Sequence, residues 1–373
     1  MAVLIPQTHL QFGSRLLQQL LRRNEKNVFV SPASLGLALG IAAAGASGET
    51  LAAIEHALGV DATVAANRAK RLFASFDTLP PGVAIEIANS LWAASGLPLS
   101  PRYAAAMRER YRAEVRNVDF GRPATITLIN DWVGRATHGQ IKSAVDQIDP
   151  SSILALVNAT YFHGLWEDPF DADDTVERDF TTGSGAVTRV RLMAKSASCD
   201  YAEDSDLQAI RLPYKGDRLS LLVVLPRKPL SPSAFHDIAA PNSLARILAA
   251  LAHRRGNLRM PTVRLGYAAD LKPELLEMGM GRAFAEDAEF PGVFDRNIPA
   301  FISTVSHKTR LEIDERGTTA AASTFMGFSL GSSIMVTPPP PFEMIVDRPF
   351  LLALIESETD LILFLGVIGN PNP

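Results

Sequence analysis

The stretch from Ile153 to Phe162 reads ILALVNATYF and is almost continuously apolar. A strand with one face in solvent alternates apolar and polar residues, whereas a strand covered on both faces shows an apolar run. This run therefore predicts a central strand with protein on both sides of its sheet.

The first third of the chain, before this strand, is mostly helical by pattern. Leucines between residues 10 and 21 form a helical stripe that ends near Asn24. Ser31 and Pro32 then suit a helix start, because serine caps and proline fits the first turn. The helix expected over 35–44 is apolar all round, which predicts that it is buried.

Helices and strands alternate after Val83, and strands dominate after about Thr175. One further helix is expected before Val83, at 48–59, and others after it at 101–111, 125–137, 243–252 and 272–278. Strands are expected at 28–30, 85–92, 115–119, 153–162, 187–193, 208–212, 219–225, 258–265, 301–313, 343–346, 350–356 and 361–367. No linker or repeat divides this order of elements, so the pattern predicts one α+β domain over residues 1–373.

Composition narrows the classes of function. The 373 residues are 47% hydrophobic and 20% charged, as in a folded globular protein, and the net charge of −4 does not favour nucleic acid as a partner. Cys199 is the single cysteine, which excludes an intramolecular disulfide and a metal cluster of cysteines. The sequence shows neither a signal peptide nor the run of roughly 18 apolar residues that a membrane span needs.

One local basic run lies on and after the helix expected at 101–111. Its members are Arg102, Arg108, Arg110, Arg112 and Arg116. A solvated helix face is the favoured interpretation, and a polyanion site is the alternative.

The segment from Glu315 to Thr337 combines features that rarely occur together. It reads ERGTTAAASTFMGFSLGSSIMVT, carries no charge after Arg316, and is followed by the proline run 338–341. Its alternation has period two, with Thr318, Ala320, Ala322, Thr324, Met326 and Phe328 on one face of a strand. A loop normally carries charges and turn formers, so this segment is expected to be exposed in one state and strand-like in another.

Five stretches of the chain, taken in order, match one known family. They read NVFVSPASLGLAL at 27–39, INDWVGRATHGQI at 129–141, LVNATYFHGLWEDPF at 156–170, HKTRLEIDERGTTAAAS at 307–323 and VDRPFLLALIESETDLILFLGVIGNP at 346–371. On these motifs the chain resembles the serpins, the serine protease inhibitor superfamily, over nearly its full length, and in particular an inhibitory member of the prokaryotic type.

The resemblance implies an α+β fold with three β-sheets, about eight or nine helices, and an exposed reactive-centre loop at about 315–341. It also implies a suicide-substrate mechanism. A serine protease attacks the loop and forms an acyl-enzyme, and the freed part of the loop then inserts as a new strand in the main sheet. An inserted strand of about 15 residues spans roughly 50 Å, enough to carry the protease across the molecule.

The resemblance likewise sets expectations about partners and location. It implies a covalent complex with a serine protease and no enzyme activity. No cofactor or metal is expected, and the net charge and the lack of a long apolar run predict neither nucleic acid nor membrane as partner. The resemblance implies a monomer, and it leaves open the formation of polymers in which the loop of one molecule joins the sheet of another. An extracellular or periplasmic location is the family expectation, while the missing signal peptide keeps a cytoplasmic location open.

Supporting roles are carried over residue by residue. The hinge of the loop matches Glu315, Gly317, Thr318, Ala320, Ala321 and Ala322. The polar cluster beneath the sheet, called the shutter, matches Ser31, Ser34, Asn158 and His307. Trp166 matches the tryptophan of the breach, where insertion begins. The simpler alternative is that these residues are helix caps, a satisfied core histidine and a core aromatic.

The cleaved bond has two candidate positions. Family spacing from Glu315 places it at Gly331–Ser332, next to Leu330, whereas Met335 and Val336 precede the proline run. No Lys or Arg lies between Gly317 and Asp347, which disfavours a trypsin-like target. Leu330 or Met335 would suit chymotrypsin-, elastase- or subtilisin-like proteases.

Two other functions compete with inhibition. A non-inhibitory serpin would act as a carrier, chaperone or storage protein, but such members tend to have a charged or bulky hinge. An enzyme is disfavoured, because the sequence has no G-x-S-x-G, H-E-x-x-H or P-loop motif.

Overall fold

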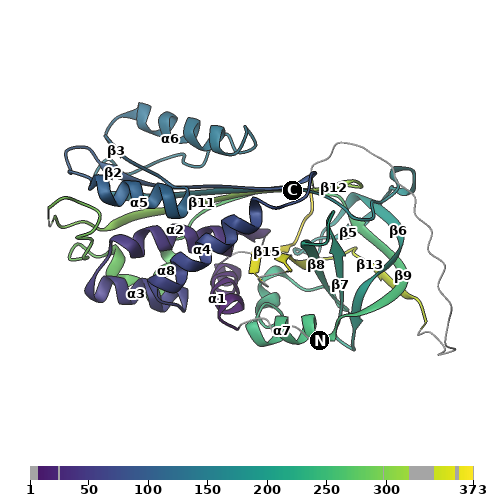
Figure 1. Cartoon of the computed structure of the whole chain (residues 1–373). Coiled ribbons are helices and arrows are strands. Elements are labelled where there is room, and N and C mark those ends of the chain that lie inside the picture. The colour runs from purple at the N-terminus through teal and green to yellow at the C-terminus, as the bar shows by residue number, and fades with distance from the viewer. Residues whose placement is uncertain (1–6, 24–25, 297, 319–339, 358–360, 373) are drawn as a thin grey trace.

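The computed structural model describes residues 7–23, 26–296, 298–318, 340–357 and 361–372 (Figure 1). The α-helices in this part of the chain are α1 Gln7–Arg23, α2 Pro32–Gly45, α3 Gly48–Leu58, α4 Ala62–Phe76, α5 Pro101–Tyr111, α6 Pro123–Ala136, α7 Pro241–Ala250 and α8 Lys272–Glu277. Short 3-10 helices are η1 Ala172–Asp174, η2 Pro232–His236 and η3 Gly281–Phe284.

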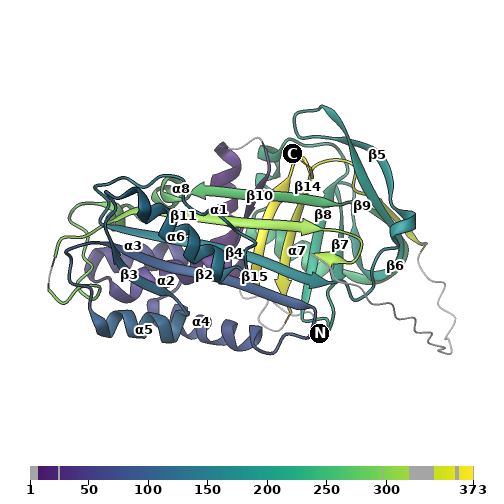
Figure 2. The same ribbon diagram turned by 90° about the horizontal axis from the view of Figure 1, so that it is seen from above.

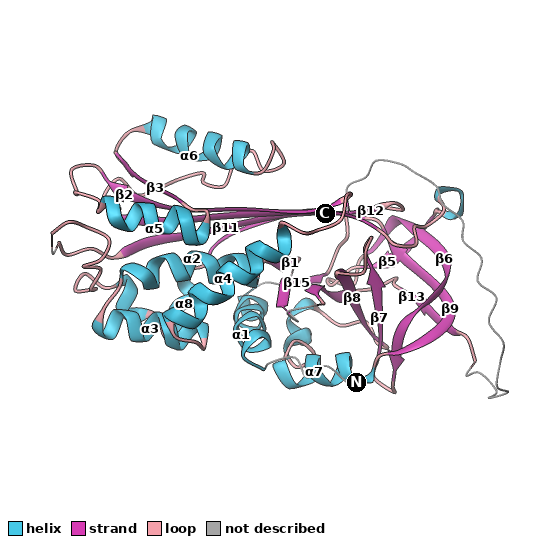
Figure 3. Ribbon diagram, in the orientation of Figure 1, coloured by secondary structure: helices cyan, strands magenta, loops and turns pink. Residues whose placement is uncertain are grey.

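The described strands are β1 Val28–Val30, β2 Val83–Ala94, β3 Glu114–Val118, β4 Leu154–Leu165, β5 Val176–Thr181, β6 Val187–Glu203, β7 Leu207–Pro213, β8 Leu219–Pro226, β9 Ala252–Pro261, β10 Val263–Asp270, β11 Ile302–Ile313, β12 Gly317–Thr318, β13 Phe342–Ile345, β14 Phe350–Glu356 and β15 Leu361–Ile368. Figure 3 shows most helices around one sheet and a second sheet at the opposite end of the molecule.

A six-stranded sheet contains the predicted central strand. Its order is β10-β11-β4-β2-β3, with β12 pairing β4 at one end (Figure 2). Both faces are covered, because α6 encloses one apolar cluster and α2 packs with the main core on the other side (Figure 1). The continuous apolar run therefore has the cause that the sequence predicted.

The second sheet has nine strands in the order β1-β15-β14-β8-β7-β6-β9-β13, with β5 also pairing β6. The 17-residue β6 pairs with β5 near its start, with β9 along its length and with β7 at its end. Because this one strand joins all three neighbours, the described strands form two hydrogen-bonded sheets rather than the three expected. The described helices and sheets confirm the predicted α+β class.

Several element boundaries differ from the expectations. Helix α4 was not predicted, although Asp61 caps it by accepting a hydrogen bond from the Val64 amide at 2.8 Å and Leu72 and Phe73 face the core. The strand expected at 258–265 is two strands, β9 and β10, which separate at Thr262. Both differences arise in segments where apolar residues are sparse or the periodicity changes within a few residues.

The start of α2 follows the prediction. Ser31 Oγ accepts a hydrogen bond from the Ser34 amide at 3.2 Å, and Pro32 occupies the first turn. In the described part of the chain, no helix has both the length and the apolar character needed to cross a bilayer. Cys199 is a free, buried thiol.

Candidate functional site

The interface between β11 and β4 is closed over most of its length. The two strands pair directly and in parallel from Ile302 opposite Leu154 to Arg310 opposite Tyr161. Past that point β4 changes partner, because the chain turns back after β11 and β12 pairs antiparallel with the last residues of β4. A strand that continued β12 along β4 would take the place of β11, so β11 and β4 would have to part.

Gly317 begins β12 in a very close approach to β4. Its φ is +150°, and a Cβ atom here would lie 2.0 Å from the Gly164 carbonyl oxygen and 2.7 Å from the Leu165 Cα. Only a residue without a side chain fits both the backbone conformation and the contact. The hinge enters the sheet because this position is glycine.

Thr318 is fully buried against an aromatic cluster. Its Oγ1 lies 2.9 Å from the Tyr214 hydroxyl, and the Tyr214 ring stacks on Trp166 at 4.4 Å. Phe162 packs edge to face with Tyr214, and the two ring centroids are 4.8 Å apart. Burial raises the pKa of the Tyr214 phenol, so this hydroxyl stays protonated and serves as a hydrogen-bonding group.

Trp166 also holds the turn that leads into the hinge. Its Nε1 donates to the Asp314 carbonyl at 3.0 Å, and its backbone amide donates to the Arg316 carbonyl at 2.9 Å. The Phe170 amide donates to the Glu315 carbonyl at 2.7 Å. Three backbone carbonyls of the turn are thus bound by one short segment after β4.

Glu315 adds an ionic contact to the second sheet. Its Oε1 lies 2.9 Å from Arg191 Nη2, and its side chain is 12% exposed. This pair connects the turn to β6. The predicted hinge and breach residues that the structure describes therefore lie together, while Ala320, Ala321 and Ala322 lie outside the described residues.

The shutter residues form a polar row through the middle of the same sheet. Asn89 of β2, Asn158 of β4 and His307 of β11 are cross-strand neighbours. Asn158 Nδ2 donates to Asn89 Oδ1, and His307 Nδ1 contacts Asn158 Oδ1. The His307–Asn158 hydrogen bond therefore bridges the β11–β4 interface.

The start of α2 completes this cluster. The Ser31 amide donates to His307 Nε2 at 3.0 Å, Ser31 Oγ donates to the Leu363 carbonyl at 2.7 Å, and Asn158 Nδ2 donates to Ser34 Oγ. Ser31 thus caps α2 and also belongs to this polar cluster.

His307 is held in one protonation state. Its Nε2 accepts from the Ser31 amide, so the neutral ring must carry its proton on Nδ1 and donate it to Asn158. Full burial lowers the pKa of His307 to about 3. Protonation would place a second N–H against the Ser31 amide and break the cluster.

Two residues of these sites escaped the sequence analysis. Asn89 interrupts an apolar strand, and that signal could have revealed it. Tyr214 had no signal, because β7 and β8 bring it to Trp166 only in three dimensions. Between Asn158 and Gly164 the two sites are six positions apart on β4, roughly 20 Å at 3.3 Å per residue.

The remaining predicted positions give a mixed outcome. Leu330, Gly331, Ser332, Met335 and Val336 lie outside the described residues. The five arginines of the basic run are exposed. Arg112 pairs with Asp77 at 2.6 Å, as a solvated helix face would.

Comparisons with known proteins agree along the whole chain. A family profile described as "Serpin (serine protease inhibitor)" matches residues 7–371. Iripin-8 of Ixodes ricinus is 33% identical over 369 residues, covering 96% of this chain and 91% of the relative. An uncharacterized serpin-like protein of Thermococcus kodakarensis is 33% identical over 354 residues, covering 93% of this chain and 82% of the relative.

Solved structures share the fold. The thermophilic serpin tengpin in its native state superimposes with a TM-score of 0.84 at 26% identity, over 97% of this chain and 93% of tengpin. Human thyroxine-binding globulin with its hormone gives a TM-score of 0.87 at 25% identity, over 99% of this chain and 100% of the globulin.

Proposed function

The chain belongs to the serpin family, and from that premise we propose that it is an inhibitor of serine proteases that acts as a suicide substrate. Serpins are in general protease inhibitors and not enzymes. The observation that carries the proposal is the position of the hinge, because Gly317 and Thr318 already pair with β4 in the direction of an inserted strand.

The energetics favour insertion once the loop is cut. A new strand between β11 and β4 would form hydrogen bonds on both sides, each contributing about 0.5–1.5 kcal/mol net. One of these two ladders replaces the lost β11–β4 pairing, and the other is the gain. The face that begins with buried Thr318 continues in the sequence with Ala320, Ala322 and Thr324, none of them charged. No desolvated charge would therefore oppose the strand.

The shutter supplies a contact that must be broken and remade. The His307–Asn158 hydrogen bond spans the interface that would separate. A hydrogen-bonded cluster is more easily rebuilt around a new strand than an interlocked apolar core. We propose Ser31, Ser34, Asn158, His307 and the added Asn89 for this role.

The class of target protease is inferred from residues 330–336, where the cleaved bond is expected. We propose cleavage between 330 and 336 by a chymotrypsin-, elastase- or subtilisin-like protease, since that segment offers Leu330 and Met335 and no Lys or Arg. A monomer acting outside the cytoplasm follows from the family expectation.

A carrier role is the second candidate. The fold is similar to that of thyroxine-binding globulin, and a depression of about 670 Å³ lies between the end of β8 and α7, within the size range of small-molecule pockets. The uncharged hinge favours inhibition over this role.

One experiment separates the candidates. The protein is incubated with chymotrypsin, pancreatic elastase, subtilisin and trypsin, and the mixtures are analysed on a denaturing gel with mass analysis of the released fragment. Inhibition predicts a covalent complex with one of the first three and a C-terminal fragment beginning at 331–337. Cleavage of the loop without any complex would contradict it.

A further inference from the structure

The chain re-enters the described structure at Pro340 and continues into β13. Among the described strands, this four-residue strand lies at the edge of the nine-stranded sheet and pairs with β9 alone. An edge strand of this length has few backbone hydrogen bonds to hold it. Side chains must therefore supply much of its attachment.

Residues 340–345 are called the stem here, and Phe342 is its apolar anchor. Its ring stacks on Tyr201 of β6 at 4.2 Å with an interplanar angle of 10°, and it is 2% exposed. Gly256 makes room for it, since a Cβ atom at that position would lie 2.3 Å from the Phe342 ring.

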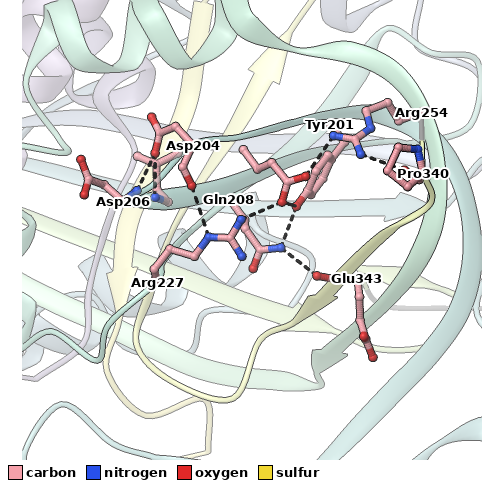
Figure 4. A network of polar contacts seen from close by, with 10 residues as sticks. Tyr201, Asp204, Asp206, Gln208, Arg227, Arg254, Pro340 and Glu343 are labelled. Atoms are coloured by element: carbon pink, nitrogen blue, oxygen red, sulfur yellow. Dashed lines mark hydrogen bonds and ion pairs between the residues drawn. The ribbon is translucent and has the colours of Figure 1, made fainter. Parts of the chain in front are cut away.

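Arg254 of β9 is the polar anchor (Figure 4). Its Nη2 donates to the Pro340 carbonyl at 2.9 Å, and its Nη1 donates to Glu203 Oε1 at 3.1 Å. The guanidinium also lies 5.2 Å from the centre of the Tyr201 ring. Its side chain is 18% exposed, so this cation is largely withdrawn from solvent.

Glu203 holds that guanidinium in place. Its other oxygen accepts from Arg227 Nη2 at 2.7 Å and from the Tyr201 hydroxyl at 2.9 Å. Gln208 extends the network, because its Nε2 donates to the Tyr201 hydroxyl at 2.6 Å and to the Glu343 carbonyl at 2.8 Å (Figure 4).

The network is self-consistent in charge. Partial burial opposes ionisation of Glu203, but hydrogen bonds from Tyr201, Arg227 and Arg254 hold its pKa below the usual range. One carboxylate thus gathers three donors, and the two arms of the network end on backbone carbonyls of the stem, at Pro340 and Glu343. Because both contacts are made to backbone carbonyls, they hold the stem in position whatever side chains it carries.

We propose that Arg254 is a positioning residue that latches the C-terminal stem of the reactive-centre loop onto β9. This inference rests on the proposed inhibitory function. The latch keeps Pro340 and β13 in place while the part of the loop before the cleaved bond moves. It also opposes insertion of an uncut loop, because such insertion would pull on the stem and peel β13 from its single neighbour.

The test compares Arg254→Gln with Arg255→Gln, which removes the same charge one position along β9 from an exposed side chain. Hydrogen exchange of the amides at 342–345 is measured by mass spectrometry for both variants and the wild type. We expect at least tenfold faster exchange in Arg254→Gln, unchanged exchange in β14 and β15, and wild-type behaviour in Arg255→Gln.

A second readout follows inhibitory capacity during incubation at 45 °C, against the protease that forms a complex with the wild type. We expect Arg254→Gln to start with the wild-type association rate constant but to lose capacity at least fivefold faster. Arg254→Lys should lie between, since a single ammonium cannot reach Glu203 and Pro340 as a guanidinium does.

The outcomes separate the two proposals. If Arg254→Gln and Arg255→Gln exchange alike at 342–345, the latch is wrong, whatever the protease assay gives. If the wild type forms no complex with any protease while exchange at 342–345 still depends on Arg254, the latch stands and the inhibitory function fails.

Discussion

Thr318 is fully buried beside the C-terminal end of β4, and its hydroxyl oxygen lies 2.9 Å from that of Tyr214. Because Thr318 is removed from solvent, an unpaired charge here would cost several kcal/mol. In the intact protein an arginine here could reach solvent if the two residue pairs of β12 were released, whereas a strand inserted between β11 and β4 would hold the charge buried.

We therefore predict that Thr318→Arg converts the inhibitor into a substrate. The fraction of protease trapped as covalent complex should fall at least tenfold, while cleavage of the loop continues. Gel densitometry of complex against cleaved product measures the change. Thr318→Val, of nearly the same shape, is the control and should keep most of the inhibition. Undiminished trapping by Thr318→Arg would speak against insertion.

His307 makes stability depend on pH through a depressed pKa. Its pKa is about 3 in the folded protein against about 6.5 when unfolded, so between these values the unfolded chain binds more protons. Stability from this group is fully present above about pH 6.5 and is lost as the pH falls towards 3.

The predicted size can be measured. Between pH 7.5 and pH 5 the wild type should lose about 2 kcal/mol of unfolding free energy relative to His307→Gln, which cannot titrate. Urea unfolding of both proteins at the two pH values tests this. Equal slopes for wild type and His307→Gln would show that His307 is not buried as a neutral ring.

At the scale of elements, the β11–β4 interface is the one that would open in the proposed mechanism. Most of its length is closed by direct pairing of β11 with β4, whereas the C-terminal end of β4 already pairs with β12. An added strand would thus extend the existing β12–β4 pairing, and it would then have to break the His307–Asn158 hydrogen bond.

A free peptide of residues 318–328, TTAAASTFMGF, should add as this strand. We predict that prolonged incubation with the peptide raises the thermal midpoint of the protein and abolishes protease trapping, because the site of the loop is then occupied. The same peptide with Arg at the position of Thr324 is the control and should do neither. Binding of both peptides with equal effect would contradict strand addition.

At the scale of the whole molecule, the proposed mechanism adds one strand to the six-stranded sheet. The six-stranded sheet pairs β11 directly with β4, while the nine-stranded sheet anchors the stem after the loop. The two attachments of the loop therefore lie on different sheets.

Cleavage between 330 and 336 should for that reason stabilise the protein. We predict a rise in thermal midpoint of roughly 10 °C or more, from the added hydrogen bonds and burial. Differential scanning calorimetry of intact and cleaved protein measures it. Cleaved Thr318→Arg should not show the rise, and a wild type that also fails to show it would favour a carrier.

The sequence by itself determined much of this protein. The apolar run at 153–162 predicted a covered central strand, Ser31 and Pro32 predicted the start of α2, and the five motifs identified the family. Each of these signals is local, because periodicity, capping and short motifs depend on residues adjacent in the chain.

Only the tertiary structure decided how distant residues meet. It brought Tyr214 to Trp166, placed Asn89 in the shutter row, and gathered Glu203, Arg254 and Pro340 into one network. It also joined through β6 what had been expected as separate sheets. The reason is physical, since contacts between strands far apart in sequence follow from register and packing, which no local pattern encodes.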